Sequence, residues 1–110
     1  MSAEQLLAIS VTDSLVGEMV AAIDEGGYLP GTLFIITADH GGHGIRHGDA
    51  PEDVVIPWLA VGPGVSAGAT LQSKVMVYDT APTALYALGL PIPPTWDGRP
   101  VLEIFGGKVE

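Results

Sequence analysis

The sequence contains no cysteine, and this absence removes several kinds of chemistry at once. Without thiols the chain can form no disulfide, no thiolate zinc site and no cysteine nucleophile. A metal site must therefore be built from histidine and carboxylate side chains. The composition otherwise fits a folded domain, with 47% hydrophobic residues, fifteen glycines and nine prolines. We expect one loop-rich α/β unit over residues 1–110.

Positive charge is also scarce. Four lysines and arginines stand against thirteen acidic residues, which gives a formal net charge of −9. Such a chain has no basic patch with which to hold a nucleic acid polymer or an anionic membrane by charge alone. A partner that carries a phosphate group would need a metal ion to offset the repulsion.

Long hydrophobic runs are missing as well. No apolar run approaches the roughly 18 residues that a membrane span needs. The N-terminal sequence MSAEQLL lacks the basic and then apolar layout of a signal peptide. We therefore expect a soluble, cytoplasmic protein that makes no membrane contact.

Apolar periodicity predicts two helices. Apolar residues recur at helical spacing between residues 14 and 23, and Glu25-Gly26-Gly27 should end that helix. A second helix should begin at Asp79–Pro82, with Asp79 as its cap and a proline in its first turn, and should end at Gly89.

Two apolar runs predict strands. Residues 32–37 are apolar at successive positions, as expected of a parallel strand that is buried on both faces. Residues 54–61 contain Pro57, which cannot donate to a ladder, so this strand should lie at an edge or carry a bulge. The prolines of residues 91–100 favour a loop.

All three histidines lie in one segment, TADHGGHGIRHGDAPED, directly after the first predicted strand. Ligands of open α/β sheets gather beyond the carboxyl ends of strands, where Asp39 and His40 stand. Gly41-Gly42 permits the bend that would bring both side chains to one ion, and His47 can return to the same region. Carboxylate and imidazole ligands suit zinc or a similar divalent ion. The alternative is a set of exposed loop histidines without a ligand role.

Three stretches in order carry a resemblance to a known family: TADHGGHGIRHG, then IPWLAVGPGV, then VYDTAPTALYALGLPIPPTWDGRPVLE. Together they resemble the C-terminal part of the type I phosphodiesterase/nucleotide pyrophosphatase and sulfatase-like branch of the alkaline phosphatase superfamily. The resemblance implies a partial alkaline-phosphatase-like fold, the C-terminal part of a mixed, mostly parallel sheet flanked by helices.

The resemblance also implies a ligand set. Asp39 and His40 match two ligands of the metal ion on the nucleophile side, and His47 matches one ligand of a second ion. The implied cofactors are two divalent metal ions, zinc first, with manganese or calcium as alternatives. His43 matches no ligand, so we expect it to support the site from outside or to be solvated. Arg46 is expected to be solvated.

The family places its nucleophile and the remaining ligands upstream of the helix at residues 13–23. Ser10 and Thr12 stand near the expected start of that helix, where capping or solvation is the simpler interpretation. We therefore assign no catalytic nucleophile, and we expect the chain to supply part of a site. A missing N-terminal portion or a homo-oligomer would supply the rest.

The first functional hypothesis is a phosphodiesterase or nucleotide pyrophosphatase that acts on small phosphate esters. A sulfatase, which hydrolyses sulfuric esters, is the near alternative, and a non-catalytic metal-binding or assembly fragment is the third. The acidic residues after His47 could orient His47 without binding the metal, but a solvated spacer is the favoured interpretation: Asp49, Glu52 and Asp53.

Overall fold

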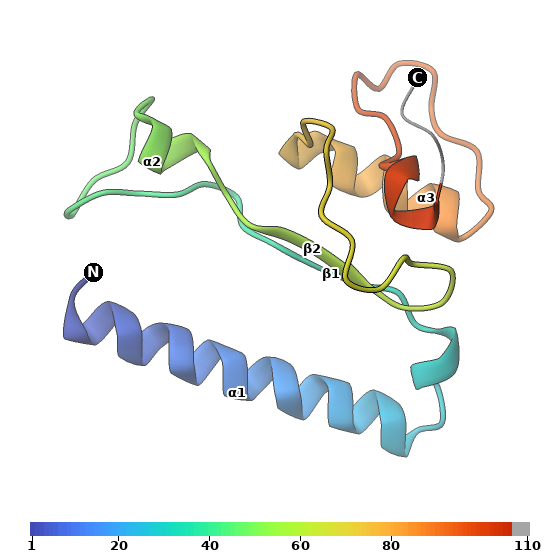
Figure 1. Ribbon diagram of the computed structural model, residues 1–110, viewed down its shortest axis with the longest axis horizontal. Helices are drawn as coiled ribbons and strands as arrows, with labels where there is room; N and C mark the ends of the chain where they lie inside the picture. Colours follow the sequence, from blue (N-terminus) through green and yellow to red (C-terminus); the bar gives the residue numbers. More distant parts are fainter. Residues whose placement is uncertain (107–110) are drawn as a thin grey trace. The chain divides into compact units, whose positions relative to one another are not determined.

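The computed structural model describes residues 1–106. The chain forms two compact units, Met1–Thr32 and Leu33–Glu110, and each is described here by itself (Figure 1). The expectation of a single domain over residues 1–110 stays a prediction.

The first unit consists of the long helix α1 (Ala3–Glu25) and a short 3-10 turn (Leu29–Gly31). The helix ends as predicted, with Gly26 as the C-cap, but it begins eleven residues earlier than the apolar pattern indicated. Its N-cap is Ser2, whose hydroxyl oxygen accepts a hydrogen bond from the amide of Gln5 at 3.2 Å. Of the two roles expected for Thr12, capping is wrong, because its hydroxyl donates to the carbonyl of Ala8 inside the helix, whereas solvation agrees with its exposed position.

Helix α1 is rich in apolar residues, although acidic residues recur along it, and none of its residues is buried. It reaches a mean hydropathy of 1.7, which is enough by length and composition for a membrane span. The expectation that no segment approaches such a length is therefore wrong for α1. The same test is passed by core helices of soluble proteins and by signal sequences, so the cytoplasmic location stays a prediction.

The second unit is built on two strands, β1 (Phe34–Thr37) and β2 (Trp58–Val61). They pair antiparallel, with Phe34 opposite Val61 and Thr37 opposite Trp58. In Figure 1 the strands lie side by side as a narrow ribbon. The fold is thus a mixture of helices and strands, as expected, but the predicted parallel pairing is not found among the described residues.

The cause is the connection between the strands. A parallel pair needs a crossover, usually a helix of several turns. The chain from β1 to β2 contains only the one-turn helix α2 (Pro51–Val54). Hydrogen bonds between its two arms turn it into a hairpin, with the amide of Gly41 donating to the carbonyl of Asp53 at 2.7 Å and that of Gly42 to Glu52 at 2.9 Å.

The ribbon has one partly covered face and one open face. Ile35 and Ala60 are half-buried on the covered face, where the indole of Trp58 donates to the hydroxyl of Thr80 at 3.0 Å. On the other face Ile36 is 43% exposed and Leu59 is 56% exposed. The expectation that the first strand is buried on both faces is therefore wrong within the described chain. Pro57 precedes β2 and takes no part in the hydrogen-bond ladder of the strand. This agrees with the general rule that proline, which has no amide hydrogen, is kept out of the ladder of a sheet.

The small core of the second unit forms around helix α3 (Thr80–Ala87) and the 3-10 turn Leu102–Phe105. Thr83 is fully buried; its hydroxyl donates to the carbonyl of Asp79 at 2.7 Å and accepts from the amide of Val101 at 2.9 Å. Val101 and Ile104 are the buried apolar residues beside it. The C-terminal segment is thereby held against α3.

Two carboxylates tie the loops of this unit together. Asp79 precedes α3 at the predicted position, but its side chain does not cap that helix. It accepts instead from the amide of Met76 at 2.8 Å and from that of Arg99 at 2.9 Å, which joins distant segments. Glu103 accepts from the amides of Gln72 and Ser73, at 2.6 and 3.1 Å, and from the Ser73 hydroxyl.

Candidate metal centre

The candidate site is the loop that follows β1. Gly41 is the point at which the two arms of the loop approach most closely. A Cβ atom there would clash with the carbonyl oxygen of Glu52, so only glycine fits without a shift of the backbone. This close contact fixes where the chain turns away immediately after Asp39 and His40.

A tight turn follows. The amide and carbonyl of His43 exchange hydrogen bonds of 3.0 Å with those of Arg46. Gly44, inside the turn, has a φ of 56°, a conformation that glycine adopts without strain. The turn brings back His47, whose ring centroid lies 4.2 Å from that of His40, with the planes tilted by 33°. The structure therefore brings together the two histidines that the sequence selected.

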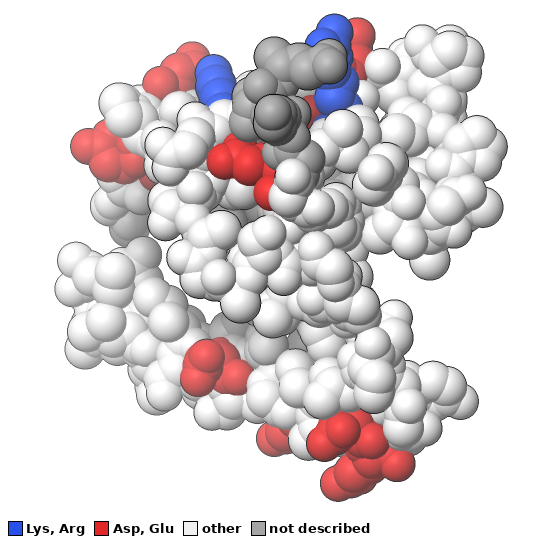
Figure 2. Space-filling model, turned by 45° about the vertical axis from the view of Figure 1, so that its right-hand side comes forward, with Lys and Arg blue, Asp and Glu red and all other residues white. Residues whose placement is uncertain are grey.

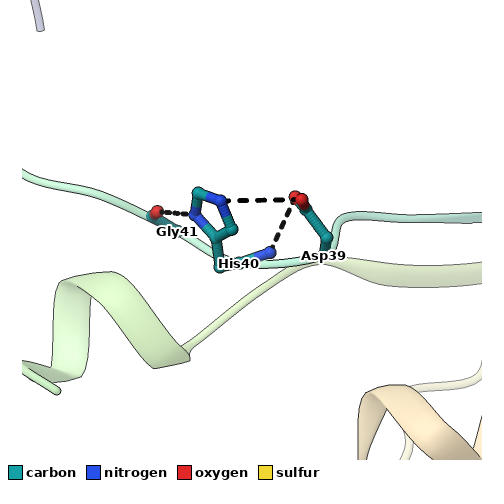
Figure 3. Close-up of polar contacts among 3 residues, drawn as sticks. All are labelled: Asp39, His40 and Gly41. Atoms are coloured by element: carbon teal, nitrogen blue, oxygen red, sulfur yellow. Dashed lines mark hydrogen bonds and ion pairs between the residues drawn. The ribbon is translucent and has the colours of Figure 1, made fainter. Parts of the chain in front are cut away.

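Two polar contacts join Asp39 and His40, and a third joins His40 to Gly41 (Figure 3). The backbone amide of His40 donates to Oδ1 of Asp39 at 2.9 Å, and Nε2 of His40 lies 3.5 Å from Oδ2 of the same carboxylate. On the opposite side of the ring, Nδ1 lies 2.7 Å from the carbonyl oxygen of Gly41. A carbonyl can only accept, so this contact requires the proton on Nδ1 and leaves the Nε2 lone pair free in the neutral ring.

This arrangement fits one divalent ion between the two side chains. Two ligand atoms about 2.0–2.1 Å from a tetrahedral zinc ion lie roughly 3.4 Å apart. The 3.5 Å separation of Nε2 and Oδ2 agrees with that value. A backbone carbonyl that holds Nδ1–H is a common orienting partner of a metal-binding histidine. Both side chains are open to solvent, Asp39 at 87% and His40 at 48% exposure.

Asp39 and His40 are too few to complete a metal site. Within residues 1–106, no group of three or more histidine and carboxylate side chains is arranged to hold an ion. The ring of His47 lies beside that of His40, with the two ring planes tilted against each other. The assignment of Asp39, His40 and His47 as metal ligands therefore stays a prediction.

The structure pairs His43 with Asp53, a contact between two residues that the sequence did not connect. Asp53 is 1% exposed, and its Oδ1 lies 2.8 Å from Nδ1 of His43, a side chain that is 57% exposed. The hydrogen bond from His43 is the main cause of the lowered pKa of Asp53. Burial opposes this shift, and the backbone amides of Gly48 and Ala50 add to it. The interpretation of Asp53 as part of a solvated spacer is wrong, whereas Asp49 and Glu52 are exposed as expected.

One sequence signal could have pointed to Asp53. Ala50 and Pro51 form the start of a helix, and the second residue after such a proline lies in the first turn of α2. That turn lies against the other arm of the loop, because the amides of Gly41 and Gly42 donate to backbone carbonyls of α2. The partner, His43, could not be named without those pairs.

Charge on the chain as a whole is predominantly negative. Figure 2 shows acidic side chains at several places on the visible face and basic ones at few. Arg46 stands exposed in the turn, as expected of a solvated arginine. An anionic ester would therefore meet a repulsive field unless a cation were bound.

Known proteins similar to this chain are sulfatases. Arylsulfatase K of Bos taurus is 32% identical over 97 residues, which cover 83% of this chain and 18% of the relative. The extracellular sulfatase SULF-1 homolog of Drosophila melanogaster is 32% identical over 108 residues, or 92% of this chain and 10% of the relative. Arylsulfatase K of Danio rerio is 33% identical over 86 residues, 73% of this chain and 16% of the relative.

No family model matches the chain, and no solved structure matches it either. The chain spans less than a fifth of the length of these curated relatives. The similarity supports the sulfatase-like side of the resemblance and a superfamily hydrolase, and it gives no support to the phosphodiesterase type. Over most of its length, this chain is similar to one short segment of sulfatases of the alkaline phosphatase superfamily.

Proposed function

We propose that this chain supplies metal ligands to a sulfatase-type hydrolase of sulfuric esters. The observation that carries the proposal is the pair Asp39 and His40, with Oδ2 and Nε2 3.5 Å apart and the opposite ring nitrogen held by Gly41. The similarity of the chain to sulfatases supports sulfuric esters as the class of substrate. The phosphodiesterase hypothesis has no comparable support.

The ligands have separate roles in this proposal. Asp39 and His40 hold one divalent ion, and His47 contributes to a second. Two-metal sites place their ions about 3.5–4 Å apart, and the rings of His40 and His47, 4.2 Å apart, suit neighbouring ions. Zinc suits the mixed oxygen and nitrogen ligands, with manganese or calcium as alternatives.

A bound divalent ion would supply positive charge for the ester oxygens and activate an oxygen nucleophile. The chain's own residues do the positioning. The amide of His40 and the carbonyl of Gly41 orient the carboxylate and the imidazole so that both can bind without rearrangement. No residue is assigned as the nucleophile, so the remaining ligands and the nucleophile come from outside this set.

The proposal also addresses the net charge of −9. A sulfate monoester is anionic and would be repelled by this surface at long range. Cations at Asp39, His40 and His47 would reverse the local field at the point where the ester has to bind. We therefore expect hydrolysis to depend strictly on added metal.

The test compares two substrates on one metal-loaded preparation. The protein is stripped with a chelator, reloaded with zinc, manganese or calcium, and assayed with p-nitrophenyl sulfate and with bis-p-nitrophenyl phosphate. Metal-dependent release from the sulfate that is lost in Asp39→Ala and His40→Ala supports the proposal. Preferential hydrolysis of the phosphodiester would overturn the sulfatase assignment. Metal binding without turnover of either substrate would show that these residues hold the ion but that the nucleophile has to be supplied by another chain, and it would count against hydrolysis by this chain alone.

A further inference from the structure

The pair formed by His43 and Asp53 lies beside the candidate ligands without belonging to them. Asp53 is nearly the most buried side chain of the described chain, and it is the only carboxylate among those with under 2% exposure. A buried carboxylate is costly unless it is paired, so its retention needs a reason.

Asp53 contacts the loop at three places. Its backbone carbonyl accepts from the amide of Gly41, next to His40. Its Oδ1 lies 2.8 Å from His43, in the turn. Its Oδ2 lies beside Gly48, next to His47, where a Cβ atom would stand 3.5 Å away. One residue thus touches the loop near both histidines and at the turn between them.

The other oxygen of the carboxylate is less well bonded. Oδ2 is buried and makes no well-formed hydrogen bond, although the backbone amides of Gly48 and Ala50 lie near the carboxylate. Because all of these contacts lie within the histidine loop, the role of the buried carboxylate should concern that loop.

We propose that His43 and Asp53 are positioning residues that hold the rings of His40 and His47 together. The hydrogen bond between them clamps the turn against α2, and the loop then presents both ligand side chains on one side. Asp53 and His43 bind no metal themselves. Their part in metal binding rests on the proposed function, whereas their control of ring geometry does not.

The experiment measures ring geometry without metal. Rings with centroids 4.2 Å apart give a direct NOE between the protons of His40 and His47 in NMR spectra of the whole chain. The variants are Asp53→Asn, which keeps the shape of the side chain, and His43→Ala, which removes a half-exposed ring. His43→Asn is the conservative variant, because its amide nitrogen can donate from near the Nδ1 position.

Glu103→Gln is the matched control. Glu103 is another carboxylate of the second unit that accepts several hydrogen bonds, and its pKa is also lowered, first by the Ser73 hydroxyl and then by the backbone amides of Gln72 and Ser73. It lies outside the histidine loop. Circular dichroism on each variant verifies that helix and strand content is kept.

We expect the NOE between His40 and His47 to disappear in Asp53→Asn and His43→Ala, and to persist in His43→Asn and Glu103→Gln. Zinc affinity should fall about 10- to 100-fold in the first two variants, as for other residues that orient metal ligands. Persistence of the NOE in Asp53→Asn, or its loss in Glu103→Gln, would overturn the inference. Failure of the chain to hydrolyse sulfate esters would leave the NOE result standing and would count against the proposed function alone.

Discussion

The rings of His40 and His47 lie 4.2 Å apart, although six residues separate them in the chain. Their approach depends on the crowded contact at Gly41, the turn at Gly44 and the anchor at Asp53. The candidate ligands are thus placed by residues that would bind no metal.

The first prediction concerns the ligands. Asp39→Ala should abolish the shift of the His40 ring signals when zinc is added, and His40→Ala should abolish the shift of the Asp39 backbone amide signal, because each variant lacks one of the two atoms that face the ion. Zinc titration followed by NMR measures this directly. Asp49→Asn is the control, since it removes an equal charge from an exposed position of the same loop. An equal loss in Asp49→Asn would show that zinc is held only by general negative charge.

The second prediction compares two glycines. Gly41→Ala would place a Cβ atom against the Glu52 carbonyl and should separate the arms of the loop, with loss of the NOE between His40 and His47. Gly17→Ala, in the interior of α1, meets no atom within 4 Å. It should stabilise the helix by roughly 0.5–1 kcal/mol, because alanine loses less backbone entropy on folding. Thermal unfolding of both variants separates crowding from helix propensity, and unchanged ring contacts in Gly41→Ala would contradict the first expectation.

A third prediction concerns Thr83, which is fully buried between two backbone groups. Thr83→Val keeps the shape but removes the partner of the Val101 amide and of the Asp79 carbonyl, and it should cost about 1–3 kcal/mol of unfolding free energy. Thr83→Ser keeps the hydroxyl and should restore most of that loss. Urea unfolding gives both values. If serine were no better than valine, packing of the methyl group would be the larger contribution.

The fourth prediction is a dependence of stability on pH. The pKa values of Asp53 and Glu103 are lowered from their ordinary values of 3.8 and 4.5, by hydrogen bonds that favour the charged form. A carboxylate with a lowered pKa in the folded state stabilises the fold above its unfolded pKa, and this contribution is lost as the pH falls through the folded value. We expect the unfolding free energy to decrease below about pH 4.5.

Glu103→Gln should flatten that decrease, since one of the two groups no longer titrates. Denaturant unfolding between pH 7 and pH 2 on the wild-type chain and on this variant provides the comparison. Identical slopes for the two proteins would show that Glu103 does not contribute to acid sensitivity.

The positions of glycine and proline in the sequence were a reliable guide to where helices begin and end. Gly26 ends α1, Pro82 lies in the first turn of α3 and Gly89, with a φ of 68°, follows it, because these residue types limit or extend the backbone wherever they stand. The start of α1 was also readable. Ser2 followed by Gln5 is the pattern of a capping box, and it outweighed the weaker apolar periodicity before residue 14.

Relationships between distant segments were not predictable. Apolar runs identify strands, but they carry no information on partner direction, and the antiparallel pairing of β1 with β2 follows from the closure of the loop between them. The side chain of Asp79 could either cap α3 or bond to a distant segment. The sequence did not show that it accepts from the amide of Arg99, which is 20 residues away. Asp39 and His40 could be selected from residue type, whereas the role of Asp53 depended on the bonds across the loop.

The bonds that shape the histidine loop also have a kinetic consequence. His43 and Asp53 are 10 residues apart, whereas the contact of Gln72 with Glu103 closes a span of 31 residues. Short spans lose less chain entropy on closure and form sooner. The candidate ligands can therefore reach their final geometry early in folding, before the contacts of longer span in the C-terminal part of the chain have formed.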